Sequence, residues 1–480
     1  MMRKQMLLAA MFAATSVFAT DYYVDAVNGN DDWDGSSSNY VSGVTGPKRT
    51  LEGMASVVPA NQGHTIWALP GWYDSKTNAD YAARVNLPKK TRLISTGGRD
   101  VTFIVGSCTN GAPASCLEGP DVTRCVSMAD NCVLQGFTLV GGRALADTKI
   151  ANASNLVINH NAGVRFNISN TGATATPTIV ADCVITNCAA MRGGASYGEN
   201  KVRCFFVNCR ITDCSGMAPM SVIAKASLWN CVIDGSKTPN TANNTIASCD
   251  LWNCTMANPA AYNSMNSCEA WNCLFPAMTD NGANTFHYCL TSLAKNSTTT
   301  WDETTQVAEG KLRLNANYRP DSLENAGLNA GDDDSYEASF VKFNESLPFV
   351  SDITPLLQKD WMGGPRIACG AIDIGAGEFS IADVKGLTMT VTDLGDGTSR
   401  LSVSQDPAGE RYVSTFSFDG ETVSLDANAR GWTWTKVISG GLGDHTLLPV
   451  YADVNCYYVD NLNGDDGDTG VGRFHAVKTI

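Results

Sequence analysis

The sequence lacks an excess of positive charge. Lys and Arg together number 34 against 48 Asp and Glu, which gives a formal net charge of −14. Nucleic acids and anionic membranes are bound chiefly through cationic side chains, so this balance argues against both as partners. Histidine is also scarce, and the five histidines form no HExxH motif or paired spacing. The sequence therefore gives no support for a zinc hydrolase.

A long apolar run is missing after the N-terminus. Residues 1–20 have the pattern of a secretory signal, in which Arg3 and Lys4 precede a short apolar stretch and small residues. The stretch is shorter than the roughly 20 residues of a membrane span. We therefore expect cleavage near Ala19 or Thr20, a mature chain with no membrane span, and a secreted or cell-surface location.

A helical apolar stripe is missing from the middle of the chain, which instead repeats a short strand around a cysteine. Successive cysteines of this repeat are 26, 22, 23, 19 and 16 residues apart. They are Cys183, Cys209, Cys231, Cys254, Cys273 and Cys289. Short strands that cannot bury an apolar face alone can do so by stacking about 4.8 Å apart. The repeat predicts an all-β domain, a right-handed parallel β-helix, with stacked coils from residue 50 to about residue 310.

In-register stacking would place each recurring residue in a column. The cysteines are expected to form an interior column of small core side chains rather than zinc ligands, because each lies within an apolar strand and not in a zinc knuckle. We expect them to be mostly reduced, because stacked partners meet the distance for a disulfide more easily than its dihedral angle, with disulfides between adjacent coils as the alternative. The total of 17 cysteines is odd, so at least one is unpaired or pairs between chains. Asn208, Asn230, Asn253 and Asn272 precede four of the column cysteines. Asparagine tolerates a left-handed backbone and can hydrogen-bond the next coil, so these residues predict sharp bends.

Three tryptophans immediately precede asparagines of this series. Trp229, Trp252 and Trp271 should therefore stack on successive coils. If they point outward, they form a strip that could bind sugar rings, and they are the candidate ligand-binding residues. If they point inward, they fill the core. The bend at the asparagines leaves both orientations open.

Two N-terminal segments carry a resemblance to a known superfamily. Residues 21–35 (DYYVDAVNGNDDWDG) and 65–73 (TIWALPGWY) resemble the N-terminal cap and first coil of pectate-lyase-like right-handed β-helix proteins. This superfamily contains lyases, hydrolases and adhesins, so the resemblance implies an architecture rather than an activity.

Later segments resemble surface proteins of the same architecture. Residues 191–195 (MRGGA) and 205–208 (FFVN) resemble the repeats of polymorphic outer-membrane adhesins. Residues 361–366 (WMGGPR) and 370–379 (GAIDIGAGEF) resemble the closing segment of the choice-of-anchor family of surface β-helices.

The chain divides into four predicted parts. After the signal, residues 21–380 are the expected β-helix with its N-terminal cap. Alternating short strands and turns in residues 381–455 predict a small Ig-like β-sandwich. Residues 457–464 (YYVDNLNG) then repeat residues 22–29 (YYVDAVNG), so residues 456–480 are expected to begin a second β-helix module that stops short.

Candidate chemistry is sparse. Asn30, Asp32 and Asp34 match the first half of a calcium loop, but the twelfth position is Val41 instead of glutamate, so a hydrogen-bonded loop without calcium is the alternative. Residues 194–198 fit the GxSxG pattern but lie between strands, where no nucleophile elbow is expected. No recurring acidic column is evident, and the catalytic residues are unknown.

We therefore expect an exported, non-catalytic β-helix protein that acts as an adhesin or binds glycans, with a polysaccharide or a cell-surface glycan as partner. An alternative is a polysaccharide lyase or glycoside hydrolase acting on an acidic or plant polysaccharide, with calcium as its possible cofactor. A structural spacer is the third hypothesis. A recurring acidic cluster on one sheet would favour the enzyme, and an exposed tryptophan strip would favour the binding protein.

Overall fold

A computed structural model gives the fold of the chain. It describes residues 19–75, 83–106, 122–144, 160–168, 177–190, 192–198, 201–216, 221–236, 245–257, 264–276, 279–280, 282–291, 299–302, 305–307, 318, 331–346, 353–364, 366, 372–378, 387–405, 413–419, 421–424, 432–439 and 447–451. The expected signal peptide and the expected second module lie almost wholly outside these residues. None of the described helices has the length and apolarity needed to cross a lipid bilayer.

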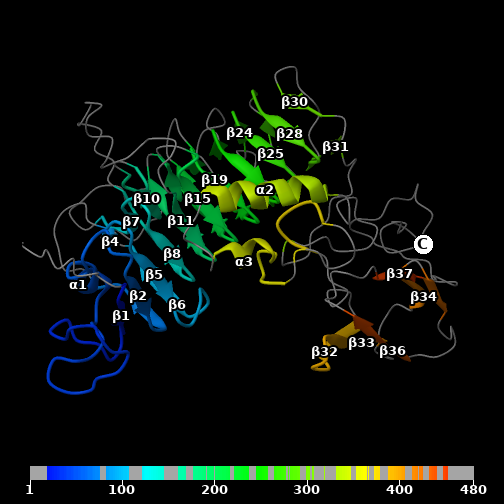
Figure 1. The fold of residues 1–480 in the computed structure, drawn as a ribbon. Coiled ribbons are helices and arrows are strands. Elements are labelled where there is room, and N and C mark those ends of the chain that lie inside the picture. Colours follow the sequence, from blue (N-terminus) through cyan, green and yellow to red (C-terminus); the bar gives the residue numbers. More distant parts are fainter. Residues whose placement is uncertain are drawn as a thin grey trace, which may run out of the picture.

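Stacked coils make a parallel β-helix with three faces (Figure 1). The first face is an 11-stranded parallel sheet. Its strands in spatial order are β1 (Asp21–Val24), β2 (Thr65–Ala68), β5 (Arg92–Ser95), β8 (Val133–Gln135), β11 (Thr178–Ala181), β15 (Cys204–Val207), β19 (Ser227–Trp229), β22 (Asp250–Trp252), β25 (Glu269–Trp271), β28 (Thr285–His287) and β30 (Thr300–Trp301).

The second face is a 10-stranded parallel sheet. Its strands are β3 (Gly71–Tyr73), β6 (Thr102–Val105), β9 (Thr138–Val140), β12 (Val184–Thr186), β16 (Arg210–Thr212), β20 (Val232–Asp234), β23 (Thr255–Met256), β26 (Leu274–Phe275), β29 (Leu290–Thr291) and β31 (Gln306–Val307). The predicted stack of coils is therefore confirmed.

The third face has two consecutive parallel sheets joined by main-chain hydrogen bonds such as that from Val164 N to Ala195 O, 2.9 Å. Its strands are β4 (Ala83–Leu87), β7 (Arg124–Met128), β10 (Val164–Phe166), β14 (Ser196–Tyr197), β18 (Ile223–Ala224), β21 (Ile246–Ala247), β24 (Ser264–Asn266) and β27 (Thr279–Asp280). The short strands β13 (Ala189–Ala190) and β17 (Ser215–Gly216) pair between the second and third faces.

A short helix, α1 (Leu51–Ala55), packs at the N-terminal end of the stack. The Thr50 side chain caps it by accepting a hydrogen bond from Gly53 N at 2.9 Å. Leu51 and Met54 are buried in the same core as the coil interior. The helix therefore covers apolar side chains of the first coils.

Left-handed residues make the corner between the first and second faces. The four predicted bend residues, Asn208, Asn230, Asn253 and Asn272, have φ between 51° and 52°. Asparagine is among the few residues that adopt this conformation readily, so the predicted bends are confirmed.

The residue after each bend points into the coil. Cys209, Cys231, Cys254 and Cys273 are all 0% exposed and share one hydrophobic core. The main-chain N–H of Cys254 donates to the Sγ of Cys273 on the next coil at 3.3 Å. The predicted interior column of cysteines is therefore confirmed, with the thiols acting as small core side chains.

Two three-stranded antiparallel sheets follow the β-helix in sequence. Their strands are β32 (Leu387–Asp393), β33 (Thr398–Gln405), β34 (Val413–Phe418), β35 (Glu421–Ser424), β36 (Trp432–Ser439) and β37 (Leu447–Tyr451). The predicted change to alternating antiparallel strands is confirmed, and the Ig-like topology stays a prediction.

We predict that the interior thiols are reduced and unreactive in the folded protein. The 13 described cysteines are all buried thiols. Burial raises the pKa of Cys132 to about 12, and the thiolate is the reactive form. Alkylation of native protein with a maleimide should leave these positions unmodified, whereas alkylation in denaturant should label all of them. Peptide mass mapping that finds disulfides among them would contradict this prediction.

Candidate functional site

An aromatic column runs along the outer side of the first face. It consists of Trp229, Trp252, Trp271 and His287, which are paired in register on β19, β22, β25 and β28. The neighbouring strand residues, such as Leu228 and Leu251, belong to the coil interior, while Trp229 and Trp252 belong to a separate outer cluster. The structure therefore settles the open question of orientation, because the tryptophans point away from the coil interior.

The rings of the aromatic column stack face to face. The centroids of Trp229 and Trp252 are 4.6 Å apart, those of Trp252 and Trp271 are 4.9 Å apart, and those of Trp271 and His287 are 5.2 Å apart. The interplanar angles are 10°, 1° and 11°. Each inner indole thus has both faces occupied by its neighbours, and only ring edges point outward.

A strap from the C-terminal part of the chain covers the column. The strap comprises residues 331–346, 353–364 and 372–378, and its helices α2 (Asp333–Ser346) and α3 (Thr354–Leu357) lie against the first face (Figure 1). Phe343 of α2 is fully buried, and its ring centroid lies 5.2 Å from that of Trp229. As a result, Trp229 is 1% exposed and Trp252 is 4% exposed.

The corner asparagines hold the strap. Asn208 Nδ2 donates to the carbonyl of Leu356 at 2.8 Å, and Asn230 Nδ2 donates to the carbonyl of Lys359 at 2.9 Å. Asn272 forms a reciprocal pair with the strap, donating to Asp332 O at 2.9 Å and accepting from Asp332 N at 2.8 Å. Among the described residues these amides bond the strap rather than the next coil, which corrects the expectation of coil-to-coil amide bonds.

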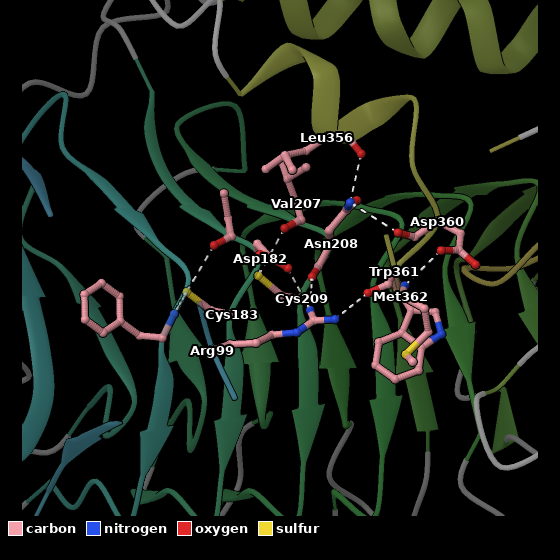
Figure 2. A network of polar contacts seen from close by, with 12 residues as sticks. Arg99, Asp182, Cys183, Val207, Asn208, Cys209, Leu356, Asp360, Trp361 and Met362 are labelled. Atoms are coloured by element: carbon pink, nitrogen blue, oxygen red, sulfur yellow. Dashed lines mark hydrogen bonds and ion pairs between the residues drawn. The ribbon is translucent and has the colours of Figure 1, made fainter. Parts of the chain in front are cut away.

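Arg99 adds a charged contact beside the first asparagine (Figure 2). Its guanidinium lies 3.0 Å from the carboxylate of Asp182 and donates to the carbonyl of Asn208 at 3.0 Å. It also donates to the carbonyl of Trp361 at 2.6 Å. Burial raises the pKa of Asp182, while the Arg99 guanidinium opposes that shift. Arg99 thus ties a bend between early strands, a later coil and the strap together.

The described residues of the segment that resembles the choice-of-anchor motif are 361–364, 366 and 372–378, and all but Arg366 belong to the strap as defined above. A buried ion pair, Arg366 Nη1 to Glu378 Oε2 at 3.7 Å, holds the segment together. Asp360 accepts the main-chain N–H of Gly364 at 2.8 Å. Gly375 has φ +110° and lies so close to the coils that a Cβ would meet Thr255 Oγ1 at 2.6 Å. The motif therefore packs along the side of the stack, where glycine is required for close approach.

Polar side chains occupy the end of the first face beyond the covered tryptophans. His287 Nδ1 lies 3.1 Å from Asp302 Oδ2, and His287 Nε2 lies 3.7 Å from Glu269 Oε1. The side chains of Glu269, His287 and Asp302 are 44%, 29% and 27% exposed. Asp302 is fixed by Thr305, whose N–H and hydroxyl donate to Oδ1 at 2.9 and 3.1 Å. We call Glu269, His287 and Asp302 the open end.

A second polar cluster lies on the second face. Arg210 contacts Asp234 at 3.4 Å and Tyr318 Oη at 2.7 Å, and Tyr318 also hydrogen-bonds Asp234. Burial, together with the bond to Asp234, raises the pKa of Tyr318 to about 12. These groups form a mutual network of one ion pair and two hydrogen bonds, while Arg210 Nε is buried without a hydrogen-bond partner among the described residues.

The predicted calcium ligands lie in the N-terminal cap. Asn30 Oδ1 accepts the N–H of Asp32 at 3.0 Å, and Asp34 Oδ1 accepts the N–H of Ser36 at 2.9 Å. These bonds are the Asx turns of the alternative interpretation. In the described part of the chain no cluster of three His, Cys, Asp or Glu residues is arranged to hold a metal. Calcium binding by Asn30, Asp32 and Asp34 stays a prediction.

The GxSxG serine is structural. Ser196 is 0% exposed and donates to the carbonyl of Val164 at 2.9 Å. Its hydroxyl is thus inside the stack, as the sequence context indicated, and cannot act as a nucleophile toward a ligand on the surface.

Part of the open end could have been predicted from the sequence by aligning the repeats on their cysteines. Asp250 and Glu269 stand four residues before Cys254 and Cys273, and they are paired in register on the first face. Asp250 is 4% exposed and bonded to Lys201 at 2.6 Å, whereas Glu269 is exposed. The acidic column is therefore short, and its uncovered member lies beside the histidine.

Ligand binding at Trp229, Trp252 and Trp271 also stays a prediction. In the arrangement described, a ligand would reach Trp229 and Trp252 only after displacement of the strap.

We predict that Phe343→Ala loosens the strap. Truncating a large buried side chain costs about 3 to 5 kcal/mol, and Phe343 is the α2 residue that packs on both Phe205 and Trp229. Tryptophan fluorescence should shift to longer wavelength, and limited proteolysis should cut within residues 331–346. Val57→Ala, at a side chain 50% exposed on the N-terminal cap, is the control and should change neither. Unchanged proteolysis of the Phe343 variant would contradict the docking described.

Comparisons with known proteins do not identify a family for this chain. No protein-family model matches the chain, and no curated protein matches it. Among solved structures, the chain is similar to a rhamnogalacturonan lyase at 15% sequence identity, over 61% of this chain and 64% of the lyase, with a TM-score of 0.23. The match spans less than two thirds of the lyase. At this level of similarity the chain's own sheet order remains the evidence for its fold.

Proposed function

We propose that the protein is an exported, non-catalytic β-helix that binds a glycan at its open end. The observation that carries the proposal is the grouping of Glu269, His287 and Asp302 on successive coils of one rigid sheet. Sugar hydroxyls both donate and accept hydrogen bonds. A carboxylate and an imidazole held side by side offer both kinds of partner.

Neighbouring residues hold the imidazole of the open end in place. His287 is held on one ring face by Trp271 and at Nδ1 by Asp302. Its orientation is therefore fixed before a ligand arrives, which lowers the entropy cost of binding. Glu269 is the most exposed of the three side chains and is the expected first contact for a sugar hydroxyl.

The charge of the open end indicates which kind of sugar residue it contacts. Two carboxylates flank one imidazole in a chain of net charge −14. Like charges repel across a short distance, so an acidic sugar is disfavoured there. Neutral or amino sugars are the expected contacts.

A carbohydrate-active enzyme is the second candidate, and one observation favours it. Asp302 at Nδ1 can fix the tautomer of His287, which would leave Nε2 facing Glu269 across 3.7 Å. An oriented imidazole beside a carboxylate is a possible general acid–base pair. In that case His287 would abstract or deliver a proton at Nε2.

A polysaccharide panel distinguishes the two candidates. We expect the full chain to be retained on neutral polysaccharides without release of reducing or unsaturated ends. Glu269→Gln should weaken retention about tenfold, because a hydrogen bond to a charged group contributes roughly 1.5 to 3 kcal/mol. Glu421→Gln, at a side chain 81% exposed on β35, is the matched control and should bind normally.

Two results would overturn the proposal. Equal retention of the Glu269→Gln variant and the wild-type protein would remove the open end as the binding site. Release of sugar ends that disappears in His287→Gln would establish the enzyme instead. Thermal melts of every variant show whether a loss of binding reflects a loss of folding.

A further inference from the structure

A group of cations gathers on the third face although the chain is acidic overall. The cationic cluster consists of Arg124, Arg192 and Lys225 around the rings of His160 and Tyr197. Arg124 begins β7, Arg192 precedes β14 and Lys225 follows β18, so the cluster spans consecutive coils. Its members are far apart in sequence, and only the stacking of coils brings them together.

Contacts among these residues fix the geometry of the cluster. Arg124 Nε donates to the carbonyl of His160 at 3.0 Å, and His160 forms a parallel main-chain bridge with Arg192. The rings of His160 and Tyr197 have centroids 5.4 Å apart, and Lys225 Nζ lies 5.1 Å from the centroid of Tyr197. The cluster therefore has a chain of contacts running from Arg124 to Lys225.

The charged side chains that act on His160 in the cluster are cations. Burial lowers the pKa of His160 to about 4, and the charged side chains that add to this shift are Arg192, Arg124 and Lys225. Burial, with Arg165 nearby, also lowers the pKa of Arg124 to about 10. His160 is thus neutral near neutral pH, and the charged groups acting on it are all cations. Such an arrangement is stabilised by an anion.

Some donors of the cluster have no partner within the described ranges. Neither the guanidinium of Arg192 nor the hydroxyl of Tyr197 is hydrogen-bonded there, and both side chains are partly exposed. Arg192 bridges His160 through the main chain and its charge acts on that ring, while the Tyr197 ring packs against the same imidazole. A guanidinium can bind a carboxylate through two hydrogen bonds, and a phenol hydroxyl can bond a sugar hydroxyl. Among the described residues, a ligand could therefore reach these donors without breaking an internal bond.

We propose that the cationic cluster binds the carboxylate of a uronic-acid residue in a glycan. Arg192 and Lys225 would contact the carboxylate, and Tyr197 would hydrogen-bond an adjacent hydroxyl. We favour an acidic sugar over a polyanion as the ligand for two reasons. The cluster has only a few cations, and the chain as a whole has a net charge of −14. A nucleic acid or anionic membrane needs many cationic contacts over a wide surface, whereas one carboxylate is recognised within a Debye length of about 8 Å.

This inference extends the proposed function, since it names a second contact for the same class of ligand. The open end contacts neutral or amino sugars, and the cationic cluster contacts acidic ones. A heteropolysaccharide with both kinds of residue would satisfy both sites.

Calorimetric titration of the full chain with a uronic-acid trisaccharide tests the inference, with the neutral trisaccharide of the same linkages as the comparison. The acidic ligand should bind at least about fivefold more tightly and should lose affinity as salt is raised. Arg192→Gln combined with Lys225→Gln should weaken it by about tenfold or more. Arg400→Gln combined with Lys436→Gln removes the same charge from β33 and β36, and this control should bind as the wild type does.

Several results would overturn the inference. These are equal binding of the acidic and neutral trisaccharides, no loss in the paired cluster variant, or equal loss in the charge-matched control. Inorganic sulfate that displaces the trisaccharide at equal concentration would show a general anion site. Tighter binding of single-stranded DNA or of vesicles with anionic lipid would assign the cluster to another partner.

The variant Glu269→Gln combined with Asp302→Asn separates this inference from the proposed function. It should retain uronic-acid binding in full, because the open end lies on a different face. Failure of the wild-type chain to bind the uronic-acid trisaccharide, while it is still retained on neutral polysaccharide, would overturn the cationic cluster alone.

Discussion

The left-handed corner residue is the constraint on which the rest of the structure depends. At six successive corners between the first and second faces, from Asp182 to Tyr288, a residue with φ between 49° and 52° turns the chain sharply, and the cysteine that follows it points inward. Main-chain hydrogen bonds then hold successive coils in register, as in the pair from Asn230 N to Trp252 O at 3.0 Å. A slip of one residue would move every inward side chain outward, so one register sets the cysteine, asparagine and tryptophan columns together.

The repeat could be predicted from sequence because it is local. Four of the repeats contain an asparagine that makes the bend, followed by a cysteine that enters the core and a short apolar strand. In three of these repeats a tryptophan lies two residues before the cysteine, so it also recurs at the same position of successive coils. The C-terminal strands could also be predicted from their alternation of apolar and polar residues, except for β35. Glu421, Thr422 and Ser424 make that strand mostly polar, and it forms as the partner of β34 in a hairpin.

The strap could not be predicted, because its contacts are long-range. Asn208 and Leu356 are separated by 148 residues, and nothing near either residue indicates the bond. The orientation of the tryptophans remained open because the bend at each asparagine makes the alternation of the strand ambiguous. The structure places them outward, and there Phe343 and α3 bury Trp229 and Trp252. Asp302 was missed for a related reason, since it reaches His287 from the next coil rather than from its own strand.

Stacking of the indoles decides how the outer surface can be used. Dispersion and desolvation favour ring faces packed on one another and leave ring edges for the strap, so the faces of the stacked indoles serve internal cohesion. In the function proposed here, the ligand contacts are polar groups beside this stack, and the ring of His287, the last in the column, is oriented by Trp271. A substitution at Trp271 should therefore disturb the open end through the position of His287, even for a ligand that never touches the indole.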